Sequence, residues 1–203
     1  MAGMKATVVM LGPPGSGKGT QAARLRDELG YEVFSTGELL RAARVDGTEL
    51  GGRAGEYMDR GALVPDDLVV AVIGAAIRGL GERPIIFDGF PRTVAQARAL
   101  DDALAGHGKR VDAAILIDIP DDEVVRRILM RHQGRSDDTP ETARERLRVY
   151  HGRTEPLVAY YEERALLRRV DGACDADSVE RGVRAELTRG APAPEGPGGG
   201  DRP

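Results

Sequence analysis

Short apolar runs alternate along the chain with longer segments whose apolar residues recur at helical spacing. Continuous apolar runs of this length are typical of strands that are covered on both faces. We predict strands at Thr7–Leu11, Pro84–Phe87 and Ala113–Ile119, with weaker candidates at Leu166–Val170 and Tyr31–Phe34. The runs are separated by helical patterns such as Gln21–Leu29 and Asp66–Leu80. This alternation predicts an α/β fold with a parallel five-stranded sheet flanked by helices.

Two further segments depart from the alternation. Residues 36–64 are polar, glycine-rich and helical without a strand, which indicates an insertion on the sheet and a candidate substrate flap. A second helix start is marked by Thr139 as N-cap, Pro140 at the first helical position and Glu141 in the first turn. Pro156 should kink or restart that helix.

The last residues, 191–203, are almost all proline, glycine and alanine. Such a segment cannot bury enough apolar surface to offset the entropy of ordering, so we exclude it from the fold. The chain of 203 residues otherwise has the size of one compact unit with small insertions.

Composition narrows the partners and the compartment. The net charge of −4 and the pI near 5.5 argue against binding to a nucleic-acid polymer or to an anionic membrane. No run of about 18 apolar residues suggests a membrane span, and no signal sequence is visible. Cys174 is the single cysteine, so neither an intrachain disulfide nor a cysteine zinc site is expected. We predict a cytoplasmic protein that does not use zinc.

A glycine-rich loop follows the first predicted strand, and a helical pattern follows the loop. Its sequence is Gly-Pro-Pro-Gly-Ser-Gly-Lys-Gly-Thr over residues 12–20. Glycines let successive backbone N–H groups point inward, and the helix N-terminus adds partial positive charge, so such a loop holds polyphosphate. Arginine outnumbers lysine 26 to 3 in this chain, yet lysine stands at position 18. A compact charge that follows a transferring phosphoryl group explains that choice.

The loop differs from the generic phosphate loop in one position. The generic loop has Ser or Thr directly after the lysine, whereas here Gly19 precedes Thr20. The sequence therefore leaves open whether the loop hydroxyl binds Mg²⁺ directly. Asp88 ends a predicted buried strand, where an acid faces the ligand crevice, and it is the candidate to hold Mg²⁺ through water.

Three motifs together resemble the nucleoside monophosphate kinases, and among them the adenylate kinase family. They are the phosphate loop, Ser-Thr-Gly-Glu-Leu-Leu-Arg at 35–41, and Asp-Gly-Phe-Pro-Arg-Thr at 88–93 with Gln96 closely following. The resemblance covers residues 7–187 and implies a P-loop NTPase-type fold. It implies reversible transfer of the terminal phosphoryl group of Mg·ATP to AMP, giving two ADP, and hence a role in adenine nucleotide homeostasis. Family members of this type are commonly monomers.

The resemblance also implies two binding sites and a catalytic set. Expected at the AMP site are Thr36, Arg41, the backbone around Leu63 and Val64, Gly89, Arg92, Gln96, Arg135 and Arg146. Expected at the ATP site are Gly15, Ser16, Gly17, Lys18, Gly19, Thr20, Arg127, Arg131 and Cys174. The catalytic groups would be Lys18, Arg92, Arg131, Arg135 and Arg146. Arginine forks match phosphate geometry, and Gln96 can both donate and accept at an adenine edge.

By the same resemblance, the chain divides into a core, an acceptor-binding insertion and a lid. The core comprises 1–35, 65–131 and 139–190, the NMP-binding insertion 36–64 and a short lid loop 132–138. Arg127 and Arg131 would share one helix face and serve ATP, while Arg135 and Arg146 clamp phosphate from the lid side. A transition state resembling metaphosphate needs this charge and positioning more than a general base.

Three other classes of protein share parts of this pattern. A GTP-driven switch needs an asparagine in its guanine motif, and the chain has none. A nonenzymatic ATP-binding regulator would have no reason to keep a complete acceptor site. A UMP/CMP kinase resembles this pattern but usually carries alanine where Thr36 stands and asparagine where Thr93 stands. Thr36 is also a candidate helix N-cap.

The three histidines show no metal spacing and no partner set. We therefore expect them on the surface: His107, His132 and His151.

Overall fold

The sheet has five strands, all parallel, in a computed structural model that describes residues 7–66, 69, 77, 83–130 and 139–189. Their order is β2-β3-β1-β4-β5. The bounds are β1 (Thr7–Leu11), β2 (Glu32–Ser35), β3 (Ile85–Asp88), β4 (Ala113–Asp118) and β5 (Leu167–Asp171). The predicted fold class is confirmed, and the predicted strands are offset from these bounds by at most one residue at either end.

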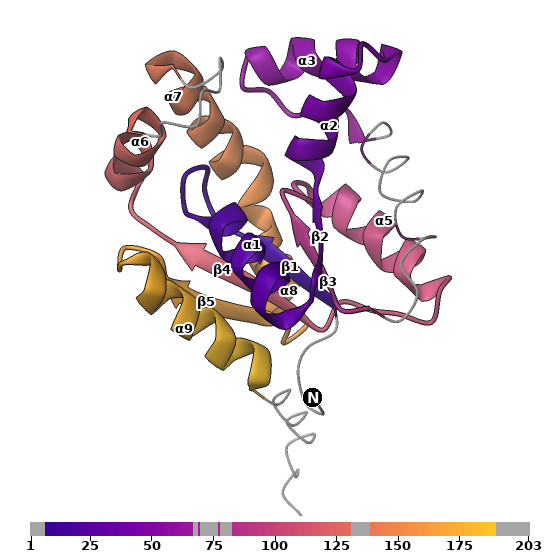
Figure 1. Cartoon of the computed structure of the whole chain (residues 1–203), viewed down its shortest axis with the longest axis vertical. Coiled ribbons are helices and arrows are strands. Elements are labelled where there is room, and N and C mark those ends of the chain that lie inside the picture. The colour runs from indigo at the N-terminus through magenta and orange to yellow at the C-terminus, as the bar shows by residue number, and fades with distance from the viewer. Residues whose placement is uncertain (1–6, 67–68, 70–76, 78–82, 131–138, 190–203) are drawn as a thin grey trace, which may run out of the picture.

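Helices connect the strands and cover the sheet on both faces (Figure 1). The bounds are α1 (Lys18–Leu29), α2 (Thr36–Val45), α3 (Glu49–Asp59), α5 (Val94–Ala105), α6 (Asp121–Leu129), α7 (Pro140–Val149), the π-helical turn η1 (Tyr150–Thr154), α8 (Pro156–Glu162) and α9 (Ala176–Thr188). Of the helix predicted at Asp66–Leu80, only three residues are described, and all three are helical.

Two cores separate across the sheet because successive strand residues point to opposite faces. Val8 and Met10 pack on the side of α1 and α9, with Leu25 and Val183. Val9 and Leu11 belong to the opposite core, which extends to α5, α8 and the insertion helices. Both faces of β1 are therefore buried, which is why the strand reads as a continuous apolar run.

The helix after residue 139 starts at the predicted cap and restarts at Pro156 as predicted, but it departs from α-helical geometry earlier, at Tyr150. The Thr139 hydroxyl accepts a hydrogen bond from the Thr142 N–H at 3.2 Å, and Pro140 occupies the first helical position. After Val149 the chain widens into η1, and Pro156 then begins α8. The ribbon from α7 to α8 runs down from beside α6 to the sheet (Figure 1).

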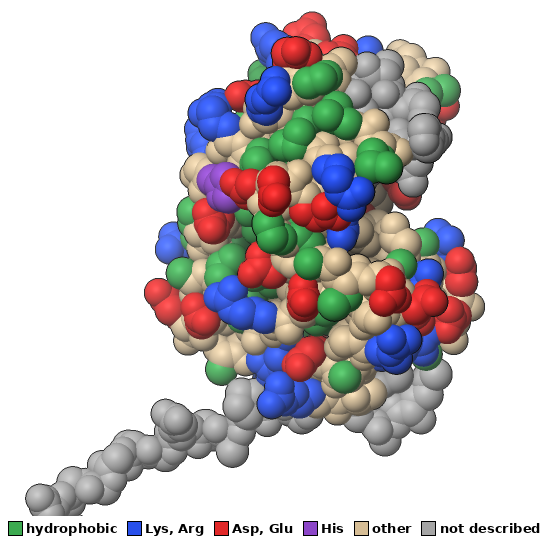
Figure 2. Space-filling model, turned by 90° about the vertical axis from the view of Figure 1, so that its left-hand side faces the viewer, with side chains coloured by type: hydrophobic (Ala, Val, Ile, Leu, Met, Phe, Trp, Pro, Cys, Tyr) green, Lys and Arg blue, Asp and Glu red, His purple; other side chains and the backbone are tan. Residues whose placement is uncertain are grey.

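Two groups of helices rise beyond the sheet. In Figure 1, α2 and α3 stand on one side, and α6 and α7 stand on the other. Figure 2 shows a surface hollowed on one side, with basic and acidic side chains interspersed over the face in view. No helix in the described part of the chain is both long and apolar enough to cross a membrane.

Candidate active site

The phosphate loop connects β1 to α1 and is tightly folded on itself. Gly12, Gly15 and Gly17 have φ of 138°, 83° and 95°, a region that L side chains rarely adopt. The Lys18 ammonium donates to the carbonyl oxygens of Gly12 at 2.7 Å and Pro13 at 2.8 Å. The loop thus holds its lysine over its own concavity, at the positive end of α1.

A pocket of about 450 Å³ opens in front of this loop. Its walls come from the loop, from α2, from the segment after α3, from the end of β3 and from α7. The sequence-predicted residues that line it are Gly15, Gly17, Lys18, Gly19, Thr20, Thr36, Arg41, Leu63, Val64, Asp88, Gly89, Arg92, Gln96 and Arg146. The fold therefore gathers every described residue that was expected at the AMP site.

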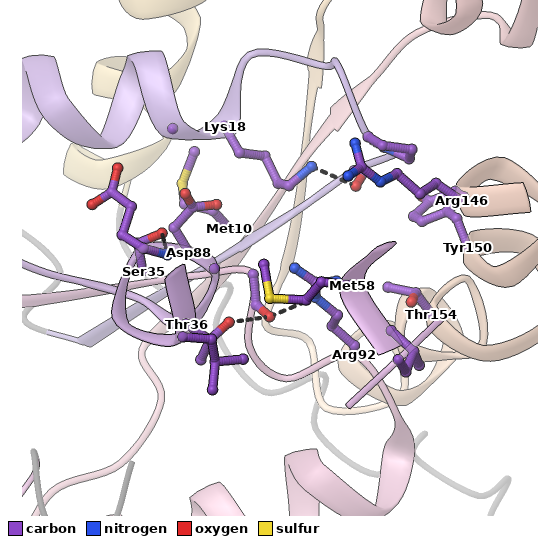
Figure 3. Close-up of a pocket in the computed structure, with 18 of the residues that line it drawn as sticks. Met10, Lys18, Ser35, Thr36, Met58, Asp88, Arg92, Arg146, Tyr150 and Thr154 are labelled. Carbon is purple, nitrogen blue, oxygen red and sulfur yellow. Dashed lines mark hydrogen bonds between the residues drawn. The ribbon is translucent and has the colours of Figure 1, made fainter. Parts of the chain in front are cut away.

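The backbone of Gly89 ties two walls of this pocket together. Its carbonyl oxygen accepts from the Thr36 hydroxyl at 2.8 Å and from Arg92 Nε at 2.8 Å (Figure 3). Gly89 has φ of 75°, and a Cβ there would lie 3.1 Å from Arg92 Nη2 and 3.2 Å from Thr36 Oγ1. Only glycine fits this position without displacing both side chains.

Thr36 does not cap its helix. The N-cap of α2 is Ser35, whose hydroxyl accepts from the Glu38 N–H at 3.4 Å. Thr36 is the first residue of α2, and its buried side chain is turned to Gly89 instead. The N-cap interpretation of Thr36 was wrong, because the neighbouring serine takes that role and leaves the threonine hydroxyl for the pocket wall.

Three arginines approach the same space from different elements. Arg92 follows β3, Arg41 is on α2 and Arg146 is on α7. Surrounding protein atoms lower the pKa of Arg92, Asp88 opposes that effect, and the charges of Arg146 and Arg41 lower it further. Arg92 nevertheless lines an open pocket and is reached by solvent. Mutual repulsion of three cations is relieved when a phosphate enters among them.

Asp88 lies where β3 meets the first turn of α1. It pairs in register with Met10 of β1 and Ser35 of β2. A Cβ on Gly19 would lie 3.3 Å from Asp88 Oδ2, so the carboxylate is against the phosphate-loop helix. No group of three or more acidic, His or Cys side chains arranged for a metal occurs among the described residues. One carboxylate beside a phosphate loop nonetheless fits Mg²⁺, which keeps several waters and takes its remaining ligands from phosphates.

Gln96, which lines the pocket, is hydrogen-bonded to Asp66. Gln96 Nε2 donates to Asp66 Oδ1 at 2.6 Å, and Gln96 Oε1 accepts from the Arg92 N–H at 2.7 Å. Gln96 lines the pocket although it is only 2% exposed. Asp66 was predicted only as the first residue of a helix and not as a residue of the site. Its position two residues after Val64, at the end of the expected Leu63–Val64 contact, was the available signal.

A second pocket, of about 440 Å³, lies behind the loop. It shares Gly15, Gly17 and Thr20 with the first pocket. The predicted ATP-site residues Ser16, Arg127 and Cys174 line it as well. The two pockets therefore meet at the phosphate loop.

Arg127 and Cys174 are held in this second pocket by acidic neighbours. Arg127 Nε donates to Glu123 Oε1 at 2.5 Å along α6. Arg126 and Arg127 together lower the pKa of Glu123 to about 2. The exposed Cys174 thiol lies 3.4 Å from Asp171 Oδ2, and this hydrogen bond raises the pKa of the thiol. A protonated thiol is a poor nucleophile, so this geometry gives Cys174 no reactive role.

Gln21 also lines the second pocket, and the sequence analysis did not single it out. Its side-chain amide donates to the Ala176 carbonyl oxygen at 2.9 Å, which joins α1 to the start of α9. Arg24, one turn further along α1, pairs with Asp177 at 2.7 Å and with Glu180 at 2.6 Å. These bonds tie α1 to the start of α9 beside the second pocket. For Gln21, the only signal in the sequence was its place directly after the phosphate-loop motif.

Some expectations fall on undescribed residues or need correction. Arg131, Arg135, His132 and the lid loop 132–138 lie outside the described residues. His151 is not without partners, because its ring nitrogens lie 3.0 Å from Asp121 Oδ2 and 3.0 Å from Glu155 Oε2. The π turn brings these acids beside it from α6 and from the end of η1, which periodicity alone does not indicate.

Comparison with known proteins gives a consistent result. A family model described as adenylate kinase matches residues 10–166. An adenylate kinase of Thermus thermophilus is 53% identical, with 89% of this chain and 96% of that protein covered. The chain is 45% identical to an adenylate kinase of Maricaulis maris, with 89% and 97% covered. It is 41% identical to one of Archaeoglobus fulgidus, with 90% and 98% covered.

Proposed function

This chain belongs to the adenylate kinase family and is an ATP:AMP phosphotransferase, and we propose that the two pockets meeting at its phosphate loop hold the two nucleotides of that reaction. The observation that carries the assignment of sites is the sharing of Gly15, Gly17 and Thr20 by both pockets. AMP occupies the pocket lined by Arg41, Arg92 and Gln96. The adenine of ATP lies in the pocket lined by Arg127 and Cys174, with its phosphates on the loop.

The charged residues bind and orient the phosphates of the two nucleotides. Lys18 and the backbone N–H groups of the loop bind the β- and γ-phosphates of ATP. Arg41 and Arg92 bind the phosphate of AMP and direct its oxygen at the γ-phosphorus. Arg146 reaches the transferring group from α7. Charge that develops on the equatorial oxygens is thus stabilised from three sides, and no side chain needs to remove a proton.

Mg²⁺ is the expected cofactor of the ATP. Asp88 would hold it through water, with Thr20 beside it on the loop. When bound, the ion neutralises phosphate charge and fixes the relative orientation of the phosphates. The position of Asp88 against Gly19 explains the missing side chain there, since a Cβ would crowd the carboxylate.

The proposal also covers the division of the chain into parts, its oligomeric state and its compartment. Residues 36–64 form the AMP-binding insertion, and residues 132–138 form a short lid whose Arg135, with Arg131, completes the arginine set. The protein works as a cytoplasmic monomer. These statements rest on the family and on the sequence of the segments concerned.

A coupled assay of ADP production tests the site assignment over a panel of AMP, CMP, UMP and GMP. We expect AMP to be preferred by at least about 10³ in kcat/KM, because a site that hydrogen-bonds one base leaves polar groups unpaired with another. Gln96→Ala should reduce the preference. An AMP/CMP ratio that is unchanged in Gln96→Ala would place base recognition elsewhere and overturn the assignment of this pocket.

A further inference from the structure

The side-chain amide of Gln96 is held on both sides by partners of opposite kinds. On one side, Asp66 Oδ1 accepts from Gln96 Nε2 at 2.6 Å. On the other side, the Arg92 N–H donates to Gln96 Oε1 at 2.7 Å. The second oxygen of Asp66 accepts from the Thr93 hydroxyl at 3.0 Å, so the carboxylate is itself fixed.

These partners allow only one orientation of the amide. A carboxylate only accepts hydrogen bonds and a peptide N–H only donates one. Turning the amide over would place its oxygen against Asp66 and its NH₂ group against the Arg92 N–H. Both contacts would become repulsive in a place where Gln96 is 2% exposed and water cannot replace them.

The fixed amide still has one N–H and one oxygen lone pair for a ligand. Adenine presents an amino donor at position 6 and an acceptor at N1. Hypoxanthine and guanine present the reverse, an acceptor at position 6 and an N1–H donor. An amide can pair with either edge, but only after it is turned over. The orientation of Gln96 is therefore a choice between the two classes of purine.

We propose that Asp66 is the positioning residue that makes the acceptor site reject 6-oxopurines, by fixing the orientation of the Gln96 amide. This inference rests on the proposed function, in which Gln96 faces the acceptor base. Asp66 acts through Gln96 and does not touch the base. The Arg92 N–H fixes the same orientation from the backbone, and Asp66 is the member of the pair that substitution can remove.

The test compares AMP with inosine monophosphate, which has the 6-oxo group and N1–H of guanine without its 2-amino group. Asp66→Asn keeps the shape of the side chain but can accept from, or donate to, the amide of Gln96. We expect the AMP/IMP ratio of kcat/KM to fall by at least about tenfold. In this variant, turning the Gln96 amide over loses only the hydrogen bond from the Arg92 N–H. AMP activity itself should fall less.

Asp101→Asn is the matched control. Asp101 also accepts a short side-chain hydrogen bond, from the Tyr160 hydroxyl at 2.7 Å, but on the far side of α5. The Asp101→Asn variant should leave the AMP/IMP ratio unchanged. Asp66→Ala is the second variant, for use if Asp66→Asn folds poorly by circular dichroism, and it should lower the ratio in the same way.

The outcomes separate the inference from the function. A ratio that stays at the wild-type value in a folded Asp66 variant, or activities with AMP and IMP that fall equally, would mean that Asp66 has only a structural role. In the Gln96→Leu background, Asp66→Asn should no longer change the ratio, and a full effect there would also overturn the inference. Failure of the wild type to use AMP at all would instead overturn the proposed function.

Discussion

Arg92 donates through Nε to the carbonyl oxygen of Gly89 at 2.8 Å, and its two terminal nitrogens make no hydrogen bond with the described residues. The bond fixes the plane of the guanidinium while its outer edge faces the pocket. A fork held in this way binds phosphate with little loss of side-chain entropy.

Substitution of Gly89 should damage this arrangement. In Gly89→Ala, the φ of 75° becomes strained and the new Cβ meets both Arg92 and Thr36. We expect a loss of about 1–2 kcal/mol in the free energy of unfolding and about 10²-fold in kcat/KM for AMP. Gly106→Ala is the control, since Gly106 has φ of −61° and its nearest contact would be 3.6 Å. Equal losses in the two variants, by thermal melting and by assay, would contradict the role given to Gly89.

Lys18→Met should abolish transfer and leave the fold intact. The substitution removes the charge that acts on the β- and γ-phosphates from a loop whose backbone is set by glycine. A loss of about 10³-fold or more in kcat is expected for a charge-stabilising group of this kind. Lys109→Met, which removes a lysine outside both pockets, is the control. If Lys18→Met retained a tenth of the wild-type kcat with a normal circular dichroism spectrum, the loop would not be the transfer site.

Arg146→Ala should lower kcat strongly and change stability little. Arg146 lines the first pocket from α7, whereas Arg148, two residues later, pairs with Glu145 at 2.7 Å on the exposed surface. We expect a kcat loss on the order of 10²-fold for Arg146→Ala and none beyond error for Arg148→Ala. Single-turnover kinetics of the two variants make the comparison. Similar rates would remove Arg146 from the catalytic set.

Stability should depend on pH through His151. The hydrogen bond that the His151 ring donates to Glu155 is the main cause that raises the pKa of His151, with burial opposing it and Asp121 adding to it. The charged form is therefore stabilised in the folded state. This contribution is complete below the ordinary pKa of about 6.5 and is lost as the pH rises through the higher folded-state pKa. Because the side chain is 42% exposed, we expect at most about 1 kcal/mol.

Urea unfolding between about pH 5.5 and about pH 8.5 measures this effect. The difference between wild type and His151→Gln should be largest at the acidic end and vanish at the alkaline end. His107→Gln removes an exposed histidine that lies beside the Ala103 carbonyl oxygen and serves as the control. A His151→Gln difference that is the same at every pH would show that the two acids do not stabilise the imidazolium.

The sheet could be predicted because its signals are local. The strand Thr7–Leu11 is buried at every position and apolar at all but Thr7, and a glycine-rich loop follows it. Helix starts carry their own caps, as at Thr139. The phosphate loop and the arginines near the acceptor motifs also stand in recognisable runs, so their gathering in one pocket follows once the strands are parallel.

Partners that come together only in the folded chain could not be predicted. Asp66 and Gln96 are 30 residues apart, and nothing in either segment indicates the other. The same holds for Gln21 and Ala176 and for His151 and Asp121. Which of two adjacent hydroxyls caps a helix is likewise decided by tertiary contact, as Ser35 and Thr36 illustrate.

The bond between Gln21 and Ala176 joins α1 to α9, the first and last helices in the described part of the chain. A protein made from its N-terminus completes β1, the phosphate loop and α1 long before it reaches Ala176. No nascent fragment that ends before Ala176 can form the second pocket, whereas every described residue of the first pocket has been made by Thr154. Under the proposed assignment, the pocket for the base of the donor nucleotide is therefore completed after the acceptor pocket, when residues 174–179 have joined the phosphate loop and Arg127.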